Sequence, residues 1–386
     1  MCKLEPTQLT ENNKIMIKKI ILTIAIFLCL LSLGGYVFYN TSDQFGADFE
    51  PASLKPYQDS KQFNGRLFSN PTVNPRTESF STGMDWLQEV LFSDAQMRPD
   101  KPLEILPVTK KTLLEPTKET RIVWFGHSTF FMQVGQMNLL FDPMLTSTPA
   151  PHPMLAGSRY SEKLPISIKD LPEIDAVLVS HDHYDHLDMV SIKQLATKVG
   201  HFYVPLGLGL HLQQWGIATE RITELDWWQT AQLGASEFTL TPAEHFSGRR
   251  FDTRNKTLWG GWVVENQSQR IFFSGDSGYG PHFKEVGRRF GEIDIAFLDT
   301  GQYNRRWARV HMTPEQGVQA AIDAKAKVMM PMHWGAFTLS LHDWDEPPER
   351  ALAEAKRLGQ AIVVPQIGEI LQLNQLKQPN GWWRDN

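Results

Sequence analysis

Residues 20–39 form the longest apolar run of the chain and contain no charged side chain. A helix needs about 20 apolar residues to cross the hydrocarbon core of a bilayer, so this run predicts one transmembrane helix. Lysines stand before the run and acidic residues follow it, namely Lys14, Lys18 and Lys19, then Asp43, Asp48 and Glu50. Because positively charged flanks stay in the cytoplasm, the pattern predicts a cytoplasmic tail over 1–19 and places the rest of the chain on the outer side of the membrane.

Two other interpretations apply to an apolar run near an N-terminus. A cleaved signal peptide needs a small-x-small site, which residues 34–39 lack, so an uncleaved anchor is favoured. A buried core helix usually keeps a polar side, which this run does not have. Met16 is an alternative start that would shorten the tail and leave the predicted anchor unchanged.

From residue 121 onward, short apolar runs alternate with turn residues and with shorter helical stretches. The runs predict strands at 122–125, 130–134, 137–141, 175–180, 202–205, 238–242, 259–264, 270–274, 295–298 and 328–332. Gly135 and Gln136 separate two of them and predict a hairpin. Thr313, Pro314 and Gln316 mark the start of a helix with a capping box. Strands that are partly paired as hairpins and partly separated by helices predict a layered α/β body with mixed sheets.

The segments on either side of this body, which we place at 121–375, differ from it in composition. Residues 40–120 are rich in proline, asparagine, serine and charged residues, with a helical signal only at 83–92. They predict an irregular arm that wraps over the body. Residues 376–386 are predicted to form a C-terminal tail. For the many tryptophans of the body and of its end, core packing is favoured over a place at a membrane interface.

Composition limits the chemistry that the body can perform. The 386 residues carry a net charge of −5, which gives no basic field and argues against a nucleic-acid partner. The two cysteines, Cys2 and Cys29, lie in the tail and in the apolar run. The body therefore has no cysteine nucleophile and no cysteine-rich zinc module. It also has no GxSxG elbow, so serine acyl transfer lacks a visible nucleophile.

Residues 181–186 read His-Asp-His-Tyr-Asp-His and directly follow the predicted strand 175–180. In an extended chain positions i and i+2 project to the same side, so His181 and His183 can converge on one ion. Where the chain turns, Asp185 and His186 can point at a second ion. Imidazole and carboxylate groups suit zinc and related divalent metals, so the cluster predicts a metal site rather than a solvated loop.

Three further candidates, His245, Asp276 and His333, each follow a predicted strand. Loop residues at strand ends gather on one edge of a sheet, where they can meet the first cluster. Taken singly, such a residue is more often a structural hydrogen-bonding group than a ligand. Taken together, the three predict the completion of two metal sites. Gly275 and Gly278 flank Asp276 and would allow a close approach of the backbone.

The order HxHxDH, then His, Asp and His, resembles that of the metallo-β-lactamase-fold hydrolases. Within them, the chain is most similar to the N-acyl-phosphatidylethanolamine-hydrolysing phospholipase D family. The matching stretches lie between about residues 120 and 340: Trp124–Thr129, Phe141–Pro143, Leu171–His181, the cluster with Leu187–Asp188, Thr241–His245, Gly275–Tyr279, His311 with Pro314–Glu315, and Met332–Gly335. HxHxDH alone marks the superfamily, and the other stretches carry the narrower resemblance. Three features depart from it: Asp182, the segment 246–248 and the apolar N-terminal run.

The resemblance implies a four-layer αββα sandwich, preceded here by one transmembrane helix, with two zinc ions at the sheet edges. It implies a ligand set for each ion and one shared ligand: His181, His183 and His245 for the first, Asp185, His186 and His333 for the second, and Asp276 as the bridge. It also implies that His311 lies beside the metals and contacts the scissile group. His127 and Asp142 would orient ligands, as outer residues of metal sites do.

Two ions about 3.5–4 Å apart can hold a bridging hydroxide that attacks phosphorus or a carbonyl carbon. Asp276 would accept its hydrogen and His311 would stabilise the developing charge, which makes them the expected catalytic residues. The resemblance implies a phosphodiesterase of the phospholipase D type acting on N-acyl-phosphatidylethanolamine-like lipids. A hydrolase of lactones or of other small esters, amides or phosphodiesters is the alternative, because one fold hosts many reactions.

A metal-bound scaffold without turnover is a third interpretation, against which the complete ligand set counts. The partners expected are a phospholipid or another small ester or phosphodiester as substrate, and the membrane through the N-terminal helix. No nucleic acid is expected, and a homodimer stays open.

Overall fold

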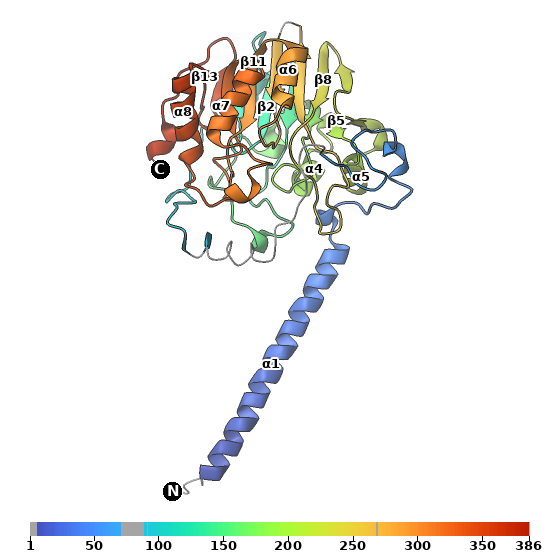
Figure 1. Cartoon of the computed structure of the whole chain (residues 1–386), viewed down its shortest axis with the longest axis vertical. Helices are drawn as coiled ribbons and strands as arrows, with labels where there is room; N and C mark the ends of the chain where they lie inside the picture. Colours follow the sequence, from blue (N-terminus) through green and yellow to red (C-terminus); the bar gives the residue numbers. More distant parts are fainter. Residues whose placement is uncertain (1–5, 71–88, 91, 268, 386) are drawn as a thin grey trace. The chain divides into compact units, whose positions relative to one another are not determined.

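The computed structural model describes residues 6–70, 89–90, 92–267 and 269–385 (Figure 1). Two compact units, Met1–Phe45 and Gly46–Asn386, divide the chain. In the first, helix α1 spans Pro6–Thr41, and its part Asn13–Thr41 is long and apolar enough to cross a membrane. None of its most apolar window is buried, which contradicts the alternative of a core helix. Such a helix can serve as a membrane anchor or as a signal sequence.

The second unit contains two seven-stranded mixed sheets. The first has the order β14-β1-β2-β3-β4-β5-β6, with β1 Arg121–Trp124, β2 Phe130–Val134, β3 Met137–Phe141, β4 Ile174–Leu178, β5 Val199–Pro205, β6 Ile222–Leu225 and β14 Ile370–Gln372. The second has the order β13-β12-β11-β10-β9-β8-β7, with β7 Thr230–Leu233, β8 Ser236–Thr241, β9 Gly261–Asn266, β10 Gln269–Phe273, β11 Ile293–Asp299, β12 Ala326–Met332 and β13 Ala361–Ile362. In each sheet, three neighbouring strand pairs are antiparallel and the other three are parallel. The antiparallel pairs run from β14 to β3 in the first sheet and from β7 to β10 in the second.

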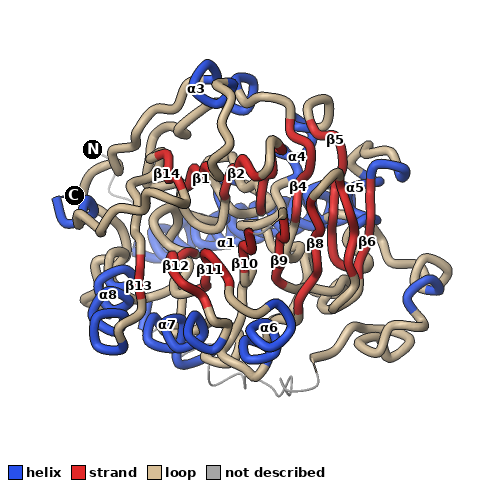
Figure 2. Tube along the Cα trace, turned by 90° about the horizontal axis from the view of Figure 1, so that it is seen from above, coloured by secondary structure: helices blue, strands red, loops and turns tan. Residues whose placement is uncertain are grey.

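Helices cover the outer faces of both sheets (Figure 2). Their bounds are α3 Lys110–Leu114, α4 Met189–Leu195, α5 Gly209–Gln214, α6 His282–Phe290, α7 Pro314–Asp323 and α8 Glu346–Leu358. Ile192 of α4 and Leu212 of α5 pack in one cluster with the first sheet, while Phe283 of α6 and Val318 of α7 pack with the second. The layers are therefore helix, sheet, sheet, helix, which confirms the expected αββα sandwich.

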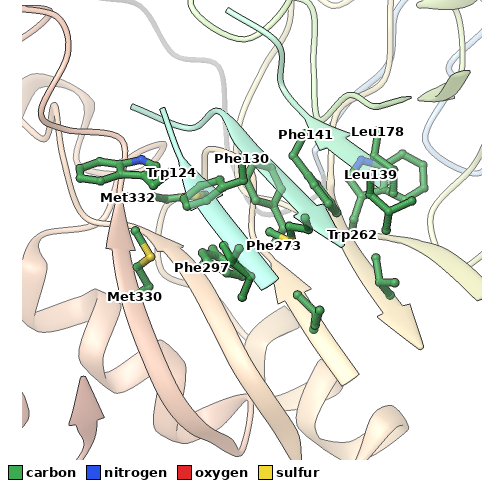
Figure 3. Packing of buried hydrophobic residues seen from close by; sticks show 14 of the residues in the cluster. Trp124, Phe130, Leu139, Phe141, Leu178, Trp262, Phe273, Phe297, Met330 and Met332 are labelled. Atoms are coloured by element: carbon green, nitrogen blue, oxygen red, sulfur yellow. The ribbon is translucent and has the colours of Figure 1, made fainter. Parts of the chain in front are cut away.

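The largest hydrophobic cluster fills the space between the two sheets (Figure 3). Phe130 and Met132 of β2 belong to it and meet Phe273 and Phe297 of the facing sheet, whereas Phe131 belongs to the cluster under the helices. This alternation follows from the two-residue period of a strand, which sends successive side chains to opposite faces. Because both faces are covered, the central strands are apolar on both sides, as their sequence indicated.

The predicted strands are all present, with ends shifted by a few residues. Strands β6, β7, β13 and β14 are additional, and they are the short edge strands of the two sheets, with partly exposed positions. Their sequences lack an apolar run, so the hydrophobic pattern did not reveal them. The helix start at Thr313 is confirmed: its side chain accepts a hydrogen bond from the Gln316 backbone N–H, and the Gln316 side chain accepts one from the Thr313 backbone N–H.

The arm and the C-terminal end both contribute to the core. Leu54, Tyr57, Phe68 and Leu103 of the arm lie in the cluster between the sheets, while most of the helical signal predicted at 83–92 lies outside the described residues. Residues expected to form a tail are buried as well: Trp382 and Trp383 pack against Trp334, at 5.7 and 5.8 Å between ring centroids. The packed body therefore continues past residue 375 and begins before residue 121.

Candidate metal centre

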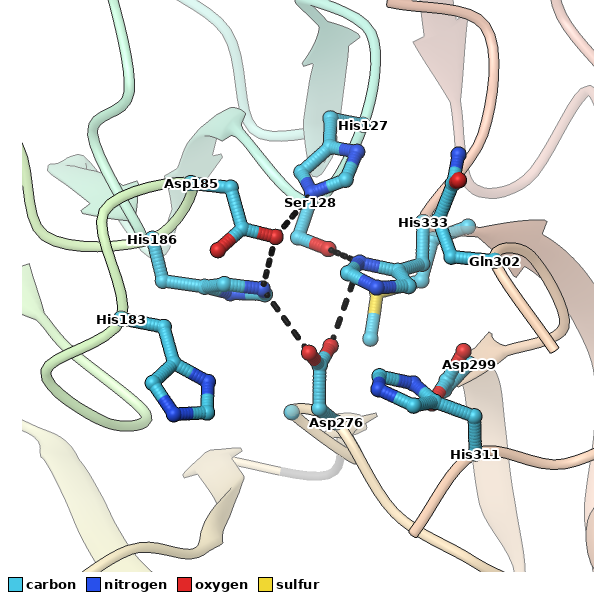
Figure 4. A network of polar contacts seen from close by, with 12 residues as sticks. His127, Ser128, His183, Asp185, His186, Asp276, Asp299, Gln302, His311 and His333 are labelled. Atoms are coloured by element: carbon cyan, nitrogen blue, oxygen red, sulfur yellow. Dashed lines mark hydrogen bonds and ion pairs between the residues drawn. The ribbon is translucent and has the colours of Figure 1, made fainter. Parts of the chain in front are cut away.

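The predicted site residues meet at the ends of strands from both sheets (Figure 4). His181 lies just beyond β4, His245 beyond β8, Asp276 beyond β10 and His333 directly after β12. Parallel strands end on the same edge, and β11 and β12 finish in register, with Asp299 opposite Met332. The structure thus brings together all eight residues selected from the sequence, and their roles as ligands stay predictions.

Three histidines and one aspartate form the first group of side chains: His181, His183, His245 and Asp276. Each offers one potential ligand atom, and these atoms lie within 4.8 Å of one another. His183 Nδ1 lies 2.9 Å from His181 Nε2 and 3.3 Å from His245 Nε2. His245 Nδ1 lies 3.0 Å from the Val310 carbonyl, which can only accept, so this nitrogen carries the hydrogen. His245 Nε2 consequently presents a lone pair to the group, as a metal ligand does.

The second group consists of His127, Asp185, His186 and His333, again within 4.8 Å. Asp185 Oδ2 lies 2.8 Å from His127 Nε2 and 3.3 Å from His186 Nε2. Asp276 connects the two groups, because its Oδ2 lies 3.1 Å from His186 Nε2 and 3.7 Å from His181 Nε2, while its Oδ1 lies 3.2 Å from His333 Nδ1. This place between the two groups is the one that the resemblance implied for Asp276.

Asp142 orients ligands of both groups from behind. Its Oδ2 lies 2.7 Å from His186 Nδ1 and accepts a hydrogen bond from the Ser180 hydroxyl at 2.6 Å. The same hydroxyl lies 2.9 Å from His181 Nδ1. Asp142 therefore has the orienting place that the resemblance implied. His127 does not stand behind the ligands, because its Nε2 faces Asp185 inside the second group.

Burial gives the three histidines of the first group the protonation state that a metal requires. It lowers the pKa of His181 and His245 well below 6.5 and that of His183 to about 4. These imidazoles are neutral near pH 7 and keep a lone pair for a cation. Burial raises the pKa of Asp276 to about 7. Burial also opposes charge on His186, but the Asp276 and Asp185 carboxylates beside it raise its pKa well above 6.5.

These residues fit a divalent metal. His186 Nε2 and Asp276 Oδ1 are buried and make no hydrogen bond within the described part of the chain, although charged partners lie near both. A buried polar atom without a hydrogen-bond partner destabilises the folded protein, and a cation between these atoms would offset that loss of free energy. Imidazole nitrogen and carboxylate oxygen are the donors that zinc and related ions take.

Backbone geometry also supports the site. Gly275 has φ +59°, and a Cβ there would lie 2.6 Å from the Gly260 carbonyl oxygen and 2.8 Å from Ser180 Cβ. Gly278 leaves no room either, with the Arg309 carbonyl oxygen 2.0 Å from a built Cβ. The close approach expected on either side of Asp276 is confirmed. His127, Asp142 and His333 hold positive φ without being glycine, the kind of strain that surrounding structure must stabilise.

Asp299 is a site residue that sequence reasoning missed. Its Oδ2 lies 2.9 Å from His311 Nδ1, and burial raises its pKa well above 3.8. The His311 ring in turn stacks on His333, with 5.1 Å between centroids and 8° between planes. Asp299 ends the apolar run Ile295–Leu298 just as Asp276 follows its own run, so the strand-end signal was present in the sequence.

Comparison with known proteins assigns the chain to a family. A model of the β-lactamase superfamily domain matches residues 137–334. An uncharacterized protein of Mycobacterium bovis is 39% identical over 267 residues, which cover 68% of this chain and 71% of that protein. The chain belongs to the metallo-β-lactamase superfamily. Its two His/Asp groups lie at the strand ends of the αββα sandwich.

Two further proteins resemble the chain, one in sequence and one in fold. An N-acyl-phosphatidylethanolamine-hydrolyzing phospholipase D of Caenorhabditis elegans is 28% identical over 333 residues, covering 79% of this chain and 92% of that protein. A solved isothiocyanate hydrolase from Delia radicum gut bacteria superposes with a TM-score of 0.52 at 18% identity, covering 66% of this chain and 98% of that one. The latter shows the fold alone. The superfamily domain and the sequence relatives confirm the expected class, a metal-dependent hydrolase of the metallo-β-lactamase superfamily.

Proposed function

We propose that the chain is a dinuclear zinc-dependent phosphodiesterase of the phospholipase D type, acting on N-acyl-phosphatidylethanolamine-like lipids. The observation that carries the proposal is the place of Asp276 between the two groups of ligand atoms. Its Oδ2 lies near His181 of the first group and His186 of the second, and its Oδ1 faces His333 of the second. A shared carboxylate between two such groups is suited to a pair of ions rather than to one. The substrate class is supported by the activity named for the C. elegans relative, which this chain matches over most of both lengths.

Each ion would have its own residues. His181, His183 and His245 would hold one ion, Asp185, His186 and His333 the other, and Asp276 both, with His127 as the further member of the second group. Zinc held there would supply Lewis acidity and the means to ionise water near neutral pH. Asp276 would take up the water's proton on a carboxylate oxygen.

His311 would contact the scissile phosphodiester. Its Nδ1 is held by Asp299 at 2.9 Å, and its ring is fixed by stacking on His333, so Nε2 is the nitrogen left for a substrate oxygen. A positioned imidazole next to a developing negative charge stabilises it more strongly in a water-poor site than in bulk solvent. For this contact the Asp299 acid would donate to Nδ1, which leaves the hydrogen of the neutral His311 ring on Nε2, where it can be donated to the substrate oxygen.

We also propose that α1 anchors the protein in a membrane, with its N-terminus in the cytoplasm and the catalytic body on the outer side. The long apolar stretch and the lysines before it support this topology. An anchored body lies close to a substrate that resides in the bilayer. Recovery of the full-length protein in the soluble fraction without detergent would contradict the anchor.

The substrate proposal is tested with detergent-solubilised full-length protein loaded with zinc. Incubation with vesicles that contain N-acyl-phosphatidylethanolamine should release the N-acylated head group and phosphatidic acid, measured by mass spectrometry of the extracted lipids. The Asp276→Asn variant, handled identically, serves as the control for contaminating activities. Hydrolysis of a lactone or a simple ester without any phospholipid cleavage would overturn the proposal in favour of a small-molecule hydrolase.

A further inference from the structure

Asp182, between two expected ligands, is the one carboxylate of the 181–186 segment that does not face the metal groups. Its Oδ1 accepts a hydrogen bond from the Gly248 backbone at 2.7 Å, and its Oδ2 accepts one from the Thr257 hydroxyl at 3.1 Å. The same oxygen lies 3.3 Å from His211 Nε2. Asp182 is fully buried, so these contacts set how the backbone between His181 and His183 is held.

His211 is the link from Asp182 to a distant part of the chain. The Ala47 backbone N–H donates to His211 Nδ1 at 2.8 Å, across 164 positions of sequence. Because Nδ1 accepts this bond, the hydrogen of the neutral ring is on Nε2, where it is donated to Asp182. His211 is fully buried in α5 and therefore has no water with which to exchange either contact.

Residues 46–49, which we call the clamp segment, surround this histidine. Gly46 has φ +74°, and a Cβ on it would lie only 2.1 Å from His211 Nδ1. Phe49 packs edge-on against the His211 ring, at 5.4 Å and 87°. Asp48 forms an ion pair with Arg250 at 2.8 Å, close in sequence to the Gly248 that donates to Asp182. The clamp segment thus contacts His211 directly and, through Asp48, pairs with the loop that contains Gly248.

We propose that the clamp segment is a positioning device for the metal centre, acting through His211 and Asp182 on His181 and His183. The order of contacts is Ala47 to His211, His211 to Asp182, and Asp182 to the backbone that carries the two ligands. Outer residues of this kind fix ligand orientation, and their loss typically lowers metal affinity by about 10–100-fold. The inference rests on the ligand roles of His181 and His183 in the proposed function and is independent of the substrate.

Two glycines of the arm give a matched test in the full-length protein. Gly46→Ala and Gly65→Ala both place a side chain at positive φ, at +74° and +90°, but only the first meets His211, because the nearest atom to a Cβ at 65 is 3.8 Å away. Zinc affinity, measured by competition with a chelator, should fall at least about 10-fold in Gly46→Ala and stay near the wild-type value in Gly65→Ala. Equal affinities in the two variants would overturn the clamp.

His211 itself can be divided into its two contacts. The amide oxygen of asparagine matches the accepting Nδ1, whereas the amide nitrogen of glutamine matches the donating Nε2. His211→Gln should keep the donor to Asp182 and lose the acceptor for Ala47, and His211→Asn should do the reverse. Each variant breaks one step of the proposed order of contacts, so zinc affinity should fall about 10–100-fold in both. The visible spectrum of the Co²⁺-substituted protein, which reports ligand geometry, should change in both variants. Unchanged spectra in both variants would show that His211 has a purely structural role and would overturn the clamp, and an unchanged zinc affinity in His211→Gln would show that the contact with Ala47 does not act on the metal centre.

Failure of the inference can be told apart from failure of the proposed function. If the wild-type protein binds no zinc or cobalt, both the proposed metal centre and the proposed clamp are refuted. If the wild-type protein binds metal and the variants bind it equally well, only the clamp is refuted. Loss of lipid cleavage plays no part in either decision, because affinity and spectrum are both measured without substrate.

Discussion

Replacing His183 with alanine is expected to abolish hydrolysis and to lower the bound metal. His183 Nδ1 lies 2.9 Å from His181 Nε2 and 3.3 Å from His245 Nε2, so its removal takes away the nitrogen that lies between the other two histidines of the first group. A ligand lost directly should cost more than the 10–100-fold in affinity typical of an outer residue, that is, more than about 100-fold. Elemental analysis after dialysis, together with turnover of the lipid substrate, measures both effects.

His201→Ala is the control for this variant. His201 is a partly buried histidine of β5, paired with the Thr223 hydroxyl at 2.8 Å, and it belongs to none of the four His/Asp groups found among the described residues. Its replacement should leave metal content and turnover near the wild-type values. An unchanged metal stoichiometry in purified His183→Ala protein would refute the assignment of His183 as a ligand.

The second large effect is expected from Asp276→Asn, which keeps the shape of the side chain and removes its charge. Because both oxygens of Asp276 face ligand groups, the variant should fold normally and lose about 10²–10³-fold in kcat, the scale of removing one strong electrostatic contact. Circular dichroism checks the fold, and kinetics with excess zinc separate a loss of rate from a loss of metal. Wild-type kinetics would contradict the central role of this carboxylate.

The metal-free form of the same variant gives a pH test. Burial raises the pKa of Asp276 from 3.8 to about 7, so the folded state favours the neutral acid. For a carboxyl group with a raised folded pKa, stability is present below the unfolded pKa and declines as pH rises towards the folded one. Without metal, the wild type should therefore lose more unfolding free energy than Asp276→Asn between about pH 4 and pH 7. If the unfolding free energies of the two proteins fall equally across this range, the carboxylate of Asp276 is stabilised in the folded protein by another contact.

Several features of this protein follow from patterns that are local in the sequence. The apolar run predicted a membrane-spanning helix, the two-residue alternation located the central strands, and Thr313 with Gln316 marked a helix start. The HxHxDH cluster and the strand-end residues His245, Asp276 and His333 could be selected because metal ligands have a restricted chemistry and because strand ends share an edge. Each of these signals depends on a few neighbouring residues, which the sequence displays directly.

Tertiary structure alone decided the remaining features. The pairing of Asp299 with His311, the entry of His127 into the second group and the bond from Ala47 to His211 join residues that no local pattern connects. Edge strands such as β6 and β7 exist because a neighbouring strand offers hydrogen bonds, and Trp383 is buried because Trp334 lies beside it. Such contacts arise when distant segments pack, since burial and hydrogen-bond satisfaction are properties of the whole fold rather than of any short stretch of chain.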